Sequence, residues 1–254
     1  MLTVEELKAA DARDGGGATH KELFDLKSFF VDYLGDLAQG VKLRQRAIAT
    51  AAVYFRRFYL RQSLREYDPR KLAPACLYLA AKVEECAVQA HDIAAQTRKV
   101  CEGERYRQEA SPSWHLTVPE LLDLELFLVQ ALEFCLVIFH PYRDAVRYAE
   151  DMGLGDGVLE EAWLMINDTY RTDLCLLFPP FLIALGVLYT VGTAHQKGHL
   201  VAPYLREANT DEAEIKQVCM EMLNFYSQPN TTTCKRALEI LAKVRGPPPP
   251  AAVA

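Results

Sequence analysis

Residues 72–85 read LAPACLYLAAKVEE, and this stretch sets the expected architecture of the chain. Its first ten residues carry no charge, and a lysine and two glutamates follow at once. Apolar residues recur at helical spacing, at positions 72, 75, 76, 79, 80 and 83. Such a pattern is typical of a helix buried over most of its circumference. It predicts the central helix of a helical bundle, with Lys82 at the edge of the buried face.

The start of this helix is signalled by Asp68-Pro69, because Asp is a good N-cap and Pro suits the first turn. Pro74 disturbs a regular helix. The central helix therefore either begins near Leu72 or bends at Pro74.

A second nearly charge-free stretch, FLIALGVLYTV, follows Pro179-Pro180. At an offset of 109 residues, Ala75 matches Ala184 and Leu79 matches Leu188, which indicates an internal repeat. We expect an all-α chain of two consecutive five-helix bundles, residues 21–135 and 141–245. Residues 1–20 form a partly flexible N-terminal segment broken by three glycines, and GPPPPAAVA, residues 246–254, is a disordered tail.

The other helices are expected from the spacing of apolar residues and from helix-capping residues. Their approximate ranges are 4–12, 21–37, 42–63, 88–101, 117–134, 142–152, 158–173, 180–194, 199–207, 210–227 and 231–244. No segment has the alternating pattern of a strand.

Composition excludes several classes of protein. The chain has 254 residues, of which 50% are hydrophobic and 24% charged, as in ordinary globular proteins. No apolar run approaches the roughly 20 residues that cross a bilayer, so no membrane association is expected. The first residues lack the apolar core of a secretion signal. Seven dispersed cysteines without a CxxC pair indicate buried thiols in a reducing compartment.

Charge is unevenly distributed along the chain. Residues 42–71 contain nine Lys or Arg against two acidic residues, a balance of +7 within a net charge of −6. The remainder of the chain therefore carries −13. Usually such a run is a solvated helix face, here with Arg56, Arg57, Arg61 and Arg65 on an exposed flank. It suggests at most a local anionic partner, without sequence-specific nucleic-acid binding.

Glu125 is the most informative polar residue. It lies in the middle of the apolar face of the helix expected at 117–134, where an unpaired carboxylate is costly to bury. Lys82 is the predicted partner. Two interpretations stay open: an internal ion pair that fixes the bundle, which spacing alone favours, or a pair that contacts another protein.

In the second bundle, Trp163 and Asn167 are one helical turn apart, with Asp168 beside them. Either Trp163 fills the core, or the three form a docking groove, a role in which Trp is over-represented. His195 and His199 are four apart, but a glycine lies between them and no third ligand is evident, so no metal site is expected. No catalytic or phosphate-binding motif occurs; we expect no enzyme and no cofactor.

Four segments of this chain resemble C-type cyclins, the cyclin partner of the Mediator-associated cyclin-dependent kinase. They read VKLRQRAIATAAVYFRRFY, YDPRKLAPACLYLAAKVEE, HPYRDAVRY and NDTYRTDLCLLFPPFLIAL. The resemblance covers about residues 21–227 and implies two cyclin boxes. It implies that Lys82 and Glu125 contact the kinase, and that Trp163, Asn167, Asp168 and Tyr226 line a groove that docks a Mediator subunit.

The chain departs from that family in two places. Where cell-cycle cyclins carry an Arg-containing substrate-docking patch, this chain reads LKSFF at 26–30, so such docking is not expected. C-type cyclins typically begin with a Trp-containing helix, whereas the first Trp here is Trp114. Either the natural chain begins earlier, or it holds its kinase differently.

The resemblance implies a nuclear regulatory subunit that binds a cyclin-dependent kinase as a heterodimer, with Mediator kinase-module subunits as further partners. It implies kinase activation and control of transcription by RNA polymerase II. The alternatives are another transcriptional cyclin with a different kinase, or a cyclin-fold DNA-binding general transcription factor. The acidic net charge argues against the last.

Overall fold

The computed structural model describes residues 3–14, 17–107, 114–207, 210–228 and 232–246. These residues form helices, turns and loops, with no strand in the part described. The chain divides into two compact units. The first unit contains residues 3–137 together with those after 231, and the second contains residues 138–231. The expected all-α class is confirmed.

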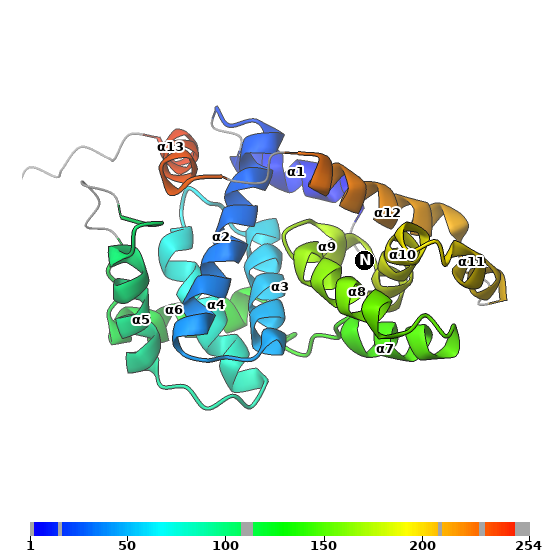
Figure 1. Cartoon of the computed structure of the whole chain (residues 1–254). Coiled ribbons are helices and arrows are strands. Elements are labelled where there is room, and N and C mark those ends of the chain that lie inside the picture. The colour runs from blue at the N-terminus through cyan, green and yellow to red at the C-terminus, as the bar shows by residue number, and fades with distance from the viewer. Residues whose placement is uncertain (1–2, 15–16, 108–113, 208–209, 229–231, 247–254) are drawn as a thin grey trace, which may run out of the picture. The chain divides into compact units, whose positions relative to one another are not determined.

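The first unit is built around α4 (Pro69–Val83), which packs against α2 (His20–Gly40), α3 (Gln45–Arg61), α5 (Ala90–Glu102) and α6 (Val118–Ala131), as Figure 1 shows. Asp68 caps α4 by accepting from the backbone N–H of Arg70 at 3.0 Å. The helix therefore begins at Pro69, and Pro74 lies within it. Every residue from Leu72 to Leu77 is buried, as the charge-free stretch predicted.

The second unit repeats this plan around α10 (Pro180–Ala194). Around α10 pack α7 (Tyr142–Asp151), α8 (Asp156–Thr169), α11 (Gly198–Glu207), α12 (Glu212–Ser227) and the short α9 (Leu174–Leu177), which sequence spacing did not predict. A Cβ on Gly186 would lie 2.6 Å from Cγ1 of Val218, so the missing side chain lets α10 and α12 pack closely. The two expected helical bundles are confirmed, and the second contains the short α9 in addition to five longer helices.

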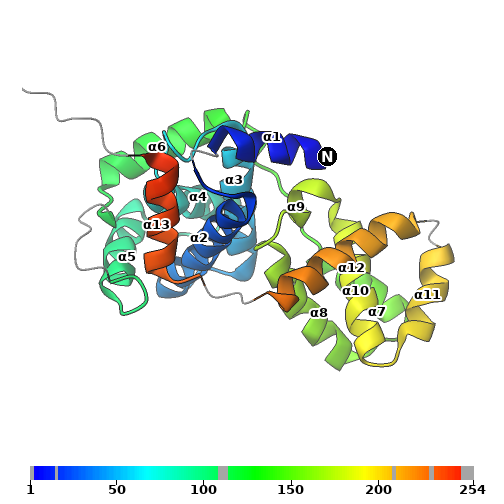
Figure 2. The ribbon, with the colours of Figure 1, turned by 90° about the horizontal axis from the view of Figure 1, so that it is seen from above.

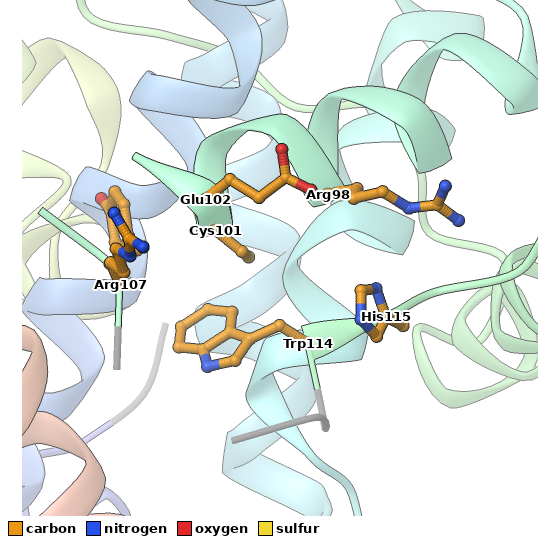
Figure 3. Close-up of a pocket in the computed structure, with 7 residues that line it drawn as sticks. Arg98, Cys101, Glu102, Arg107, Trp114 and His115 are labelled. Carbon is orange, nitrogen blue, oxygen red and sulfur yellow. The ribbon is translucent and has the colours of Figure 1, made fainter. Parts of the chain in front are cut away.

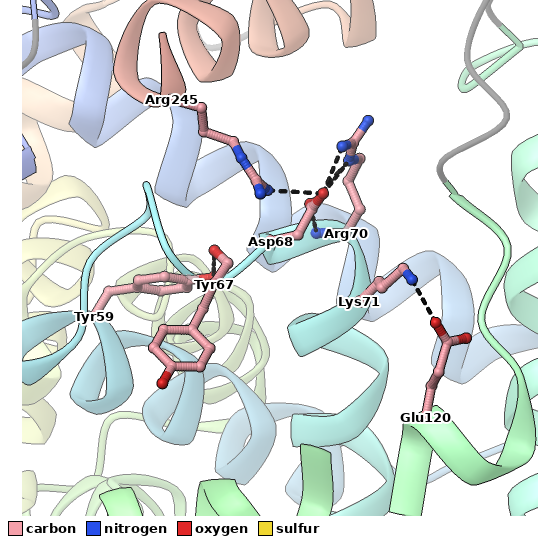
Figure 4. Close-up of polar contacts among 7 residues, drawn as sticks. All are labelled: Tyr59, Tyr67, Asp68, Arg70, Lys71, Glu120 and Arg245. Atoms are coloured by element: carbon pink, nitrogen blue, oxygen red, sulfur yellow. Dashed lines mark hydrogen bonds and ion pairs between the residues drawn. The ribbon is translucent and has the colours of Figure 1, made fainter. Parts of the chain in front are cut away.

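The C-terminal helix α13 (Cys234–Arg245) corrects the predicted division. It was expected in the second bundle, within 141–245, but it belongs to the first unit and packs along α2 (Figure 2). Its apolar face is buried, and Arg236 and Lys243 both reach Glu22 at 2.7 Å. Arg245 contacts Asp68 at 2.9 Å (Figure 4). Periodicity identifies an amphipathic helix but does not say which bundle it covers.

The N-terminal segment is also part of the first unit. Helix α1 (Val4–Asp14) packs against α2 and α3. Asp11 contacts Lys27 at 2.6 Å, and Asp14 accepts from the Leu64 N–H at 3.0 Å. Both carboxylates are buried, so α1 is fixed by paired polar groups as well as by apolar contact. The predicted breaks at residues 15–16 and 247–254 lie outside the described residues.

Acid should release α13 from α2. Glu22 accepts from Lys243, Arg236 and the N–H of Thr19, and the hydrogen bond from Lys243, with the smaller help of Thr19, lowers its pKa from 4.5 to about 2. A depressed carboxyl pKa stabilises the folded state above pH 4.5, and that contribution disappears as pH falls towards 2. We expect the protection of the buried Cys234 thiol to fall over this interval. Protection is measured with 4,4′-dithiodipyridine, which reacts with thiols in acid, as the labelling rate relative to that of the urea-unfolded chain at the same pH.

The matched variant is Glu22→Gln, which keeps the side-chain size but removes the charge. It should label faster at neutral pH and show a smaller step in acid. Protection of Cys234 that persists until the whole chain unfolds would contradict this role of Glu22.

Candidate functional site

Lys82 and Glu125 meet on the surface of the first unit. Lys82 lies in the last turn of α4, Glu125 lies in the middle of α6, and the Nζ–Oε1 distance is 2.6 Å. The Lys82 side chain is 50% exposed, whereas that of Glu125 is 12% exposed. The hydrogen bond to Glu125 raises the pKa of Lys82, so the lysine is charged at neutral pH. The predicted contact is confirmed, and its cation is half available to a partner.

Large apolar side chains are exposed on the same helix and just after it. Their exposed fractions are 44% for Leu122, 64% for Leu126, 72% for Phe134 and 74% for Val137. Single exposed apolar residues are common, but four within sixteen residues, two on α6 and two just after it, make this segment a candidate interaction surface. The sequence did not single them out, because the spacing of apolar residues identifies the buried face of a helix and not the exposed apolar residues beside it.

Several cations of the basic stretch 42–71 are buried or ion-paired within the first unit. Arg56, expected on an exposed flank, is only 2% exposed and is therefore a core residue, which corrects that expectation. Other cations of the stretch form ion pairs within the unit: Arg46 with Glu84, Arg61 with Glu133, Arg70 with Asp68, and Lys71 with Glu120. Figure 4 shows the last two pairs. Three of these acids, Glu84, Glu133 and Glu120, lie outside the stretch, so pairing with them lowers its balance from +7 to +4. Part of the positive charge is therefore used in contacts within the unit.

The four residues expected in the second unit come together at the C-terminal end of α8. Tyr142 packs on Trp163 with ring centroids 4.6 Å apart and donates to Oδ1 of Asn167 at 2.8 Å. Tyr226 of α12 donates to Oδ2 of Asp168 at 2.7 Å. Tyr142, which links Trp163 to Asn167, was not singled out from the sequence. Only the fold places it beside α8.

This cluster, Trp163, Asn167, Asp168 and Tyr226, is open to solvent. Trp163 is 38% exposed and Tyr226 is 47% exposed, so Trp163 does not simply fill the core. Burial, followed by the hydrogen bond to Asp168, raises the pKa of Tyr226, which keeps the phenol protonated and donating. Two aromatic rings flank an amide and a carboxylate, an arrangement suited to binding a peptide segment.

Two further features are a pocket in the first unit and the His195 side chain in the second. A pocket of about 440 Å³ is lined by Arg98, Cys101, Glu102, Tyr106, Arg107, Trp114 and His115 (Figure 3). Burial raises the pKa of the Cys101 thiol to about 11, which leaves it unreactive.

His195 contacts Glu161 at 2.9 Å. Across the described ranges, no group of three metal-ligating side chains occurs and no helix is long and apolar enough to cross a membrane.

Comparison with known proteins agrees with the fold. The family model described as Cyclin, N-terminal domain matches residues 4–137. Among solved structures, a chain of the yeast RNA Pol II CTD kinase CTDK-1 complex superposes with a TM-score of 0.75 at 17% identity, covering 97% of this chain and 83% of that one. A viral cyclin from herpesvirus saimiri superposes at 0.63 and 14% identity, covering 81% and 86%. The two helical bundles and the family match together identify the chain as a cyclin.

Relatives of similar sequence show to which group of cyclins the chain belongs. Cyclin-C of Rattus norvegicus is 38% identical over 234 residues, covering 91% of this chain and 83% of the relative. Cyclin-C1-1 of Oryza sativa subsp. japonica is 40% identical over 228 residues, covering 89% and 84%. The chain belongs to the cyclin-C family. Cyclins are non-catalytic regulatory subunits of cyclin-dependent kinases, so the expectation that this chain is not an enzyme is confirmed.

Proposed function

We propose that this chain binds and activates the cyclin-dependent kinase of the Mediator complex, in the nucleus, and thereby regulates transcription by RNA polymerase II. The observation that carries the proposal is the half-exposed Lys82–Glu125 pair beside an exposed apolar surface on the first unit. Membership of the cyclin-C family supports the choice of kinase.

The pair suits a protein interface because its two members are unequally exposed. Glu125 is nearly buried and accepts from Lys82 with one oxygen, while Lys82 keeps two further N–H donors. A kinase surface that covers the pair supplies acceptors to those donors and removes water from the ion pair, which strengthens it. Leu122 and Leu126, on the same helix as Glu125, and Phe134 and Val137, just after that helix, provide exposed apolar area of the kind that stable interfaces need.

Activation follows from binding one kinase conformation better than another. A protein kinase is active only when its own Lys–Glu ion pair is formed. A cyclin whose Lys82–Glu125 face contacts the kinase in that conformation shifts the equilibrium towards it by the difference in affinity for the two states. The cyclin therefore needs no catalytic group of its own.

The cluster at Trp163, Asn167, Asp168 and Tyr226 is the proposed docking site for a Mediator subunit. Asn167 accepts from Tyr142 through its Oδ1 and keeps its amide N–H groups for a peptide backbone. Asp168 accepts from Tyr226 through Oδ2, and its Oδ1 pairs with Arg171 at the longer distance of 3.4 Å, so a peptide N–H competes for this oxygen with Arg171. Leu164, Met220 and Leu223, also on α8 and α12, are exposed as well. Aromatic rings with polar groups between them are typical of binding hot spots.

Replacing Asn167 and Asp168 together with Ala should weaken recruitment of that subunit about tenfold or more, because its polar groups would be desolvated without partners. Kinase binding should stay unchanged, since these residues lie in the second unit. Pull-down of both partners by the tagged variant measures the two effects separately. Equal loss of both partners would show that the cluster is structural.

The proposed function is tested by affinity purification of the tagged chain from nuclear extract, with mass spectrometry of the co-eluting proteins. We expect one cyclin-dependent kinase in stoichiometric amount, accompanied by Mediator subunits. Recovery of a different kinase without Mediator subunits would overturn the Mediator assignment and leave the chain a cyclin of another complex.

A further inference from the structure

The chain reverses direction after α6 in a turn that glycine usually makes. The N–H of Phe134 bonds to the carbonyl of Val129 at 3.1 Å, and the N–H of Glu133 bonds to that of Gln130 at 2.9 Å. This is the Schellman arrangement, in which the residue after the helix cap adopts a left-handed conformation. That residue is Glu133, with φ of 53°.

Five helices in the described ranges end in this way: α7 has Gly153 at the left-handed position, and the other four have a residue with a side chain there. One of these four differs from the rest. Helices α2, α4 and α10 are each followed by a single left-handed residue, which is Lys42, Glu85 and Gln196 in turn. After α6, Phe134 is left-handed too, with φ of 60°. Within the described residues this is the one place where two successive non-glycine residues have positive φ. A bulky side chain in that conformation is strained.

Burial of the Phe134 ring does not compensate for this strain, because the ring is 72% exposed. Strained backbone persists only where the surrounding structure holds it, and such places cluster at binding sites. The question is which side chains hold the turn.

Two side chains of α3 hold it. The hydroxyl of Tyr54 donates to the carbonyl of Leu136 at 2.5 Å, and the Arg61 guanidinium pairs with Glu133. The Arg61–Glu133 pair is exposed, with 54% and 64% of each side chain accessible, so water and salt weaken it. Tyr54 is fully buried, and its hydrogen bond is correspondingly the stronger restraint.

The same face of α3 also anchors the end of α4. Thr50, one turn before Tyr54, donates to Oε1 of Glu84 at 2.7 Å. Glu84 follows directly after the turn that carries Lys82. Helix α3 thus fixes the Lys82 end of α4 and the Phe134 turn against each other, so both parts of the exposed surface share one support.

We infer that Tyr54 is a positioning residue for kinase binding: its hydrogen bond to Leu136 holds the turn after α6 in the strained conformation that presents the Phe134 ring to the kinase. The inference rests on the proposed function, because it assumes that Phe134 lies in the kinase interface. Without this bond the turn relaxes, and only a fraction of the molecules presents the ring. The measured affinity is the intrinsic affinity multiplied by that fraction.

The test compares two tyrosines of one helix. Tyr59 is also buried in α3, and its hydroxyl donates to the carbonyl of Tyr67 at 3.0 Å, far along the chain from the turn (Figure 4). Tyr54→Phe and Tyr59→Phe therefore remove the same atom from equivalent surroundings. We expect Tyr54→Phe to weaken binding of the co-purified kinase about three- to tenfold, the value of one hydrogen bond, and Tyr59→Phe to leave it unchanged.

Hydrogen exchange gives a readout that needs no kinase. The amides of Phe134 and Leu136 should exchange faster in Tyr54→Phe and at the wild-type rate in Tyr59→Phe. The exposed substitution Arg61→Met, which does not threaten the fold, should shift binding and exchange in the same direction by a smaller amount.

Three results overturn the inference in distinguishable ways. Equal weakening by Tyr54→Phe and Tyr59→Phe would mean general loosening of the core. Weakening by Phe134→Ala without any effect of Tyr54→Phe would keep the kinase interface and exclude the positioning role. No effect of Phe134→Ala would show that the turn lies outside the interface. If the double variant Lys82→Met/Glu125→Leu also bound the kinase like the wild type, the proposed kinase face itself would be refuted.

Discussion

Replacing Lys82 with Met and Glu125 with Leu together is expected to weaken kinase binding by about 2–5 kcal/mol while the chain stays folded. Ion pairs between helices stabilise a fold weakly, and apolar residues of similar volume often replace them without loss. An interface pair is different, because the kinase groups that contact it would be buried without partners. Calorimetry of kinase binding and thermal unfolding of the variant separate the two effects.

The chain supplies a matched control for this variant. Lys71 and Glu120 join the same two helices, with the same Nζ–Oε1 distance of 2.6 Å (Figure 4). Glu120 also closes the capping box of α6, so the control is Lys71→Met with Glu120→Gln, which keeps a capping side chain. It should bind the kinase like the wild type. If both double variants bind equally well, the Lys82–Glu125 pair is structural and the kinase face lies elsewhere.

Phe30→Ala is expected to lower the free energy of unfolding of the first unit by about 3–5 kcal/mol. The Phe30 ring is fully buried and lies 5.4 Å from the Phe29 ring, 5.9 Å from Phe55 and 6.3 Å from Trp114, measured between centroids. Removing the ring leaves a cavity among neighbours that are themselves fixed by packing, so the site cannot collapse around it.

Urea unfolding monitored by Trp114 fluorescence measures this loss, in a Trp163→Phe background that leaves Trp114 as the single tryptophan. The control is Phe134→Ala, which removes the same ring from an exposed position and should change stability by no more than about 0.5 kcal/mol. A loss below 1 kcal/mol for Phe30→Ala would mean that the aromatic cluster is loosely packed.

The sequence predicted the two central helices because a long charge-free stretch has few stable environments other than a bundle core. The same reasoning located the Lys82–Glu125 contact, since a carboxylate among leucines requires a nearby cation and Lys82 was at the edge of the central helix. Both predictions rest on the cost of burying charge, which depends little on the details of packing.

Other features depend on contacts between distant residues and could not be read from local patterns. Arg56 looked like a surface cation but is buried, because the stem of arginine packs like an apolar side chain. The spacing of apolar residues predicts that α13 is amphipathic. Its position on α2 depends on contacts of Arg236 and Lys243 with Glu22, more than 200 residues earlier in the chain. The turn after α6 and its bond to Tyr54 link residues 82 apart.

Kinase activation is the most direct measurement of the central claim. The purified chain is titrated into the kinase that co-purifies with it, and the initial rate of peptide phosphorylation is followed. We predict that the rate rises and saturates with the wild-type chain and with the Lys71/Glu120 control, and that the Lys82/Glu125 variant reaches half-saturation only at a much higher concentration. A folded wild-type chain that binds this kinase and leaves its rate unchanged would contradict the account.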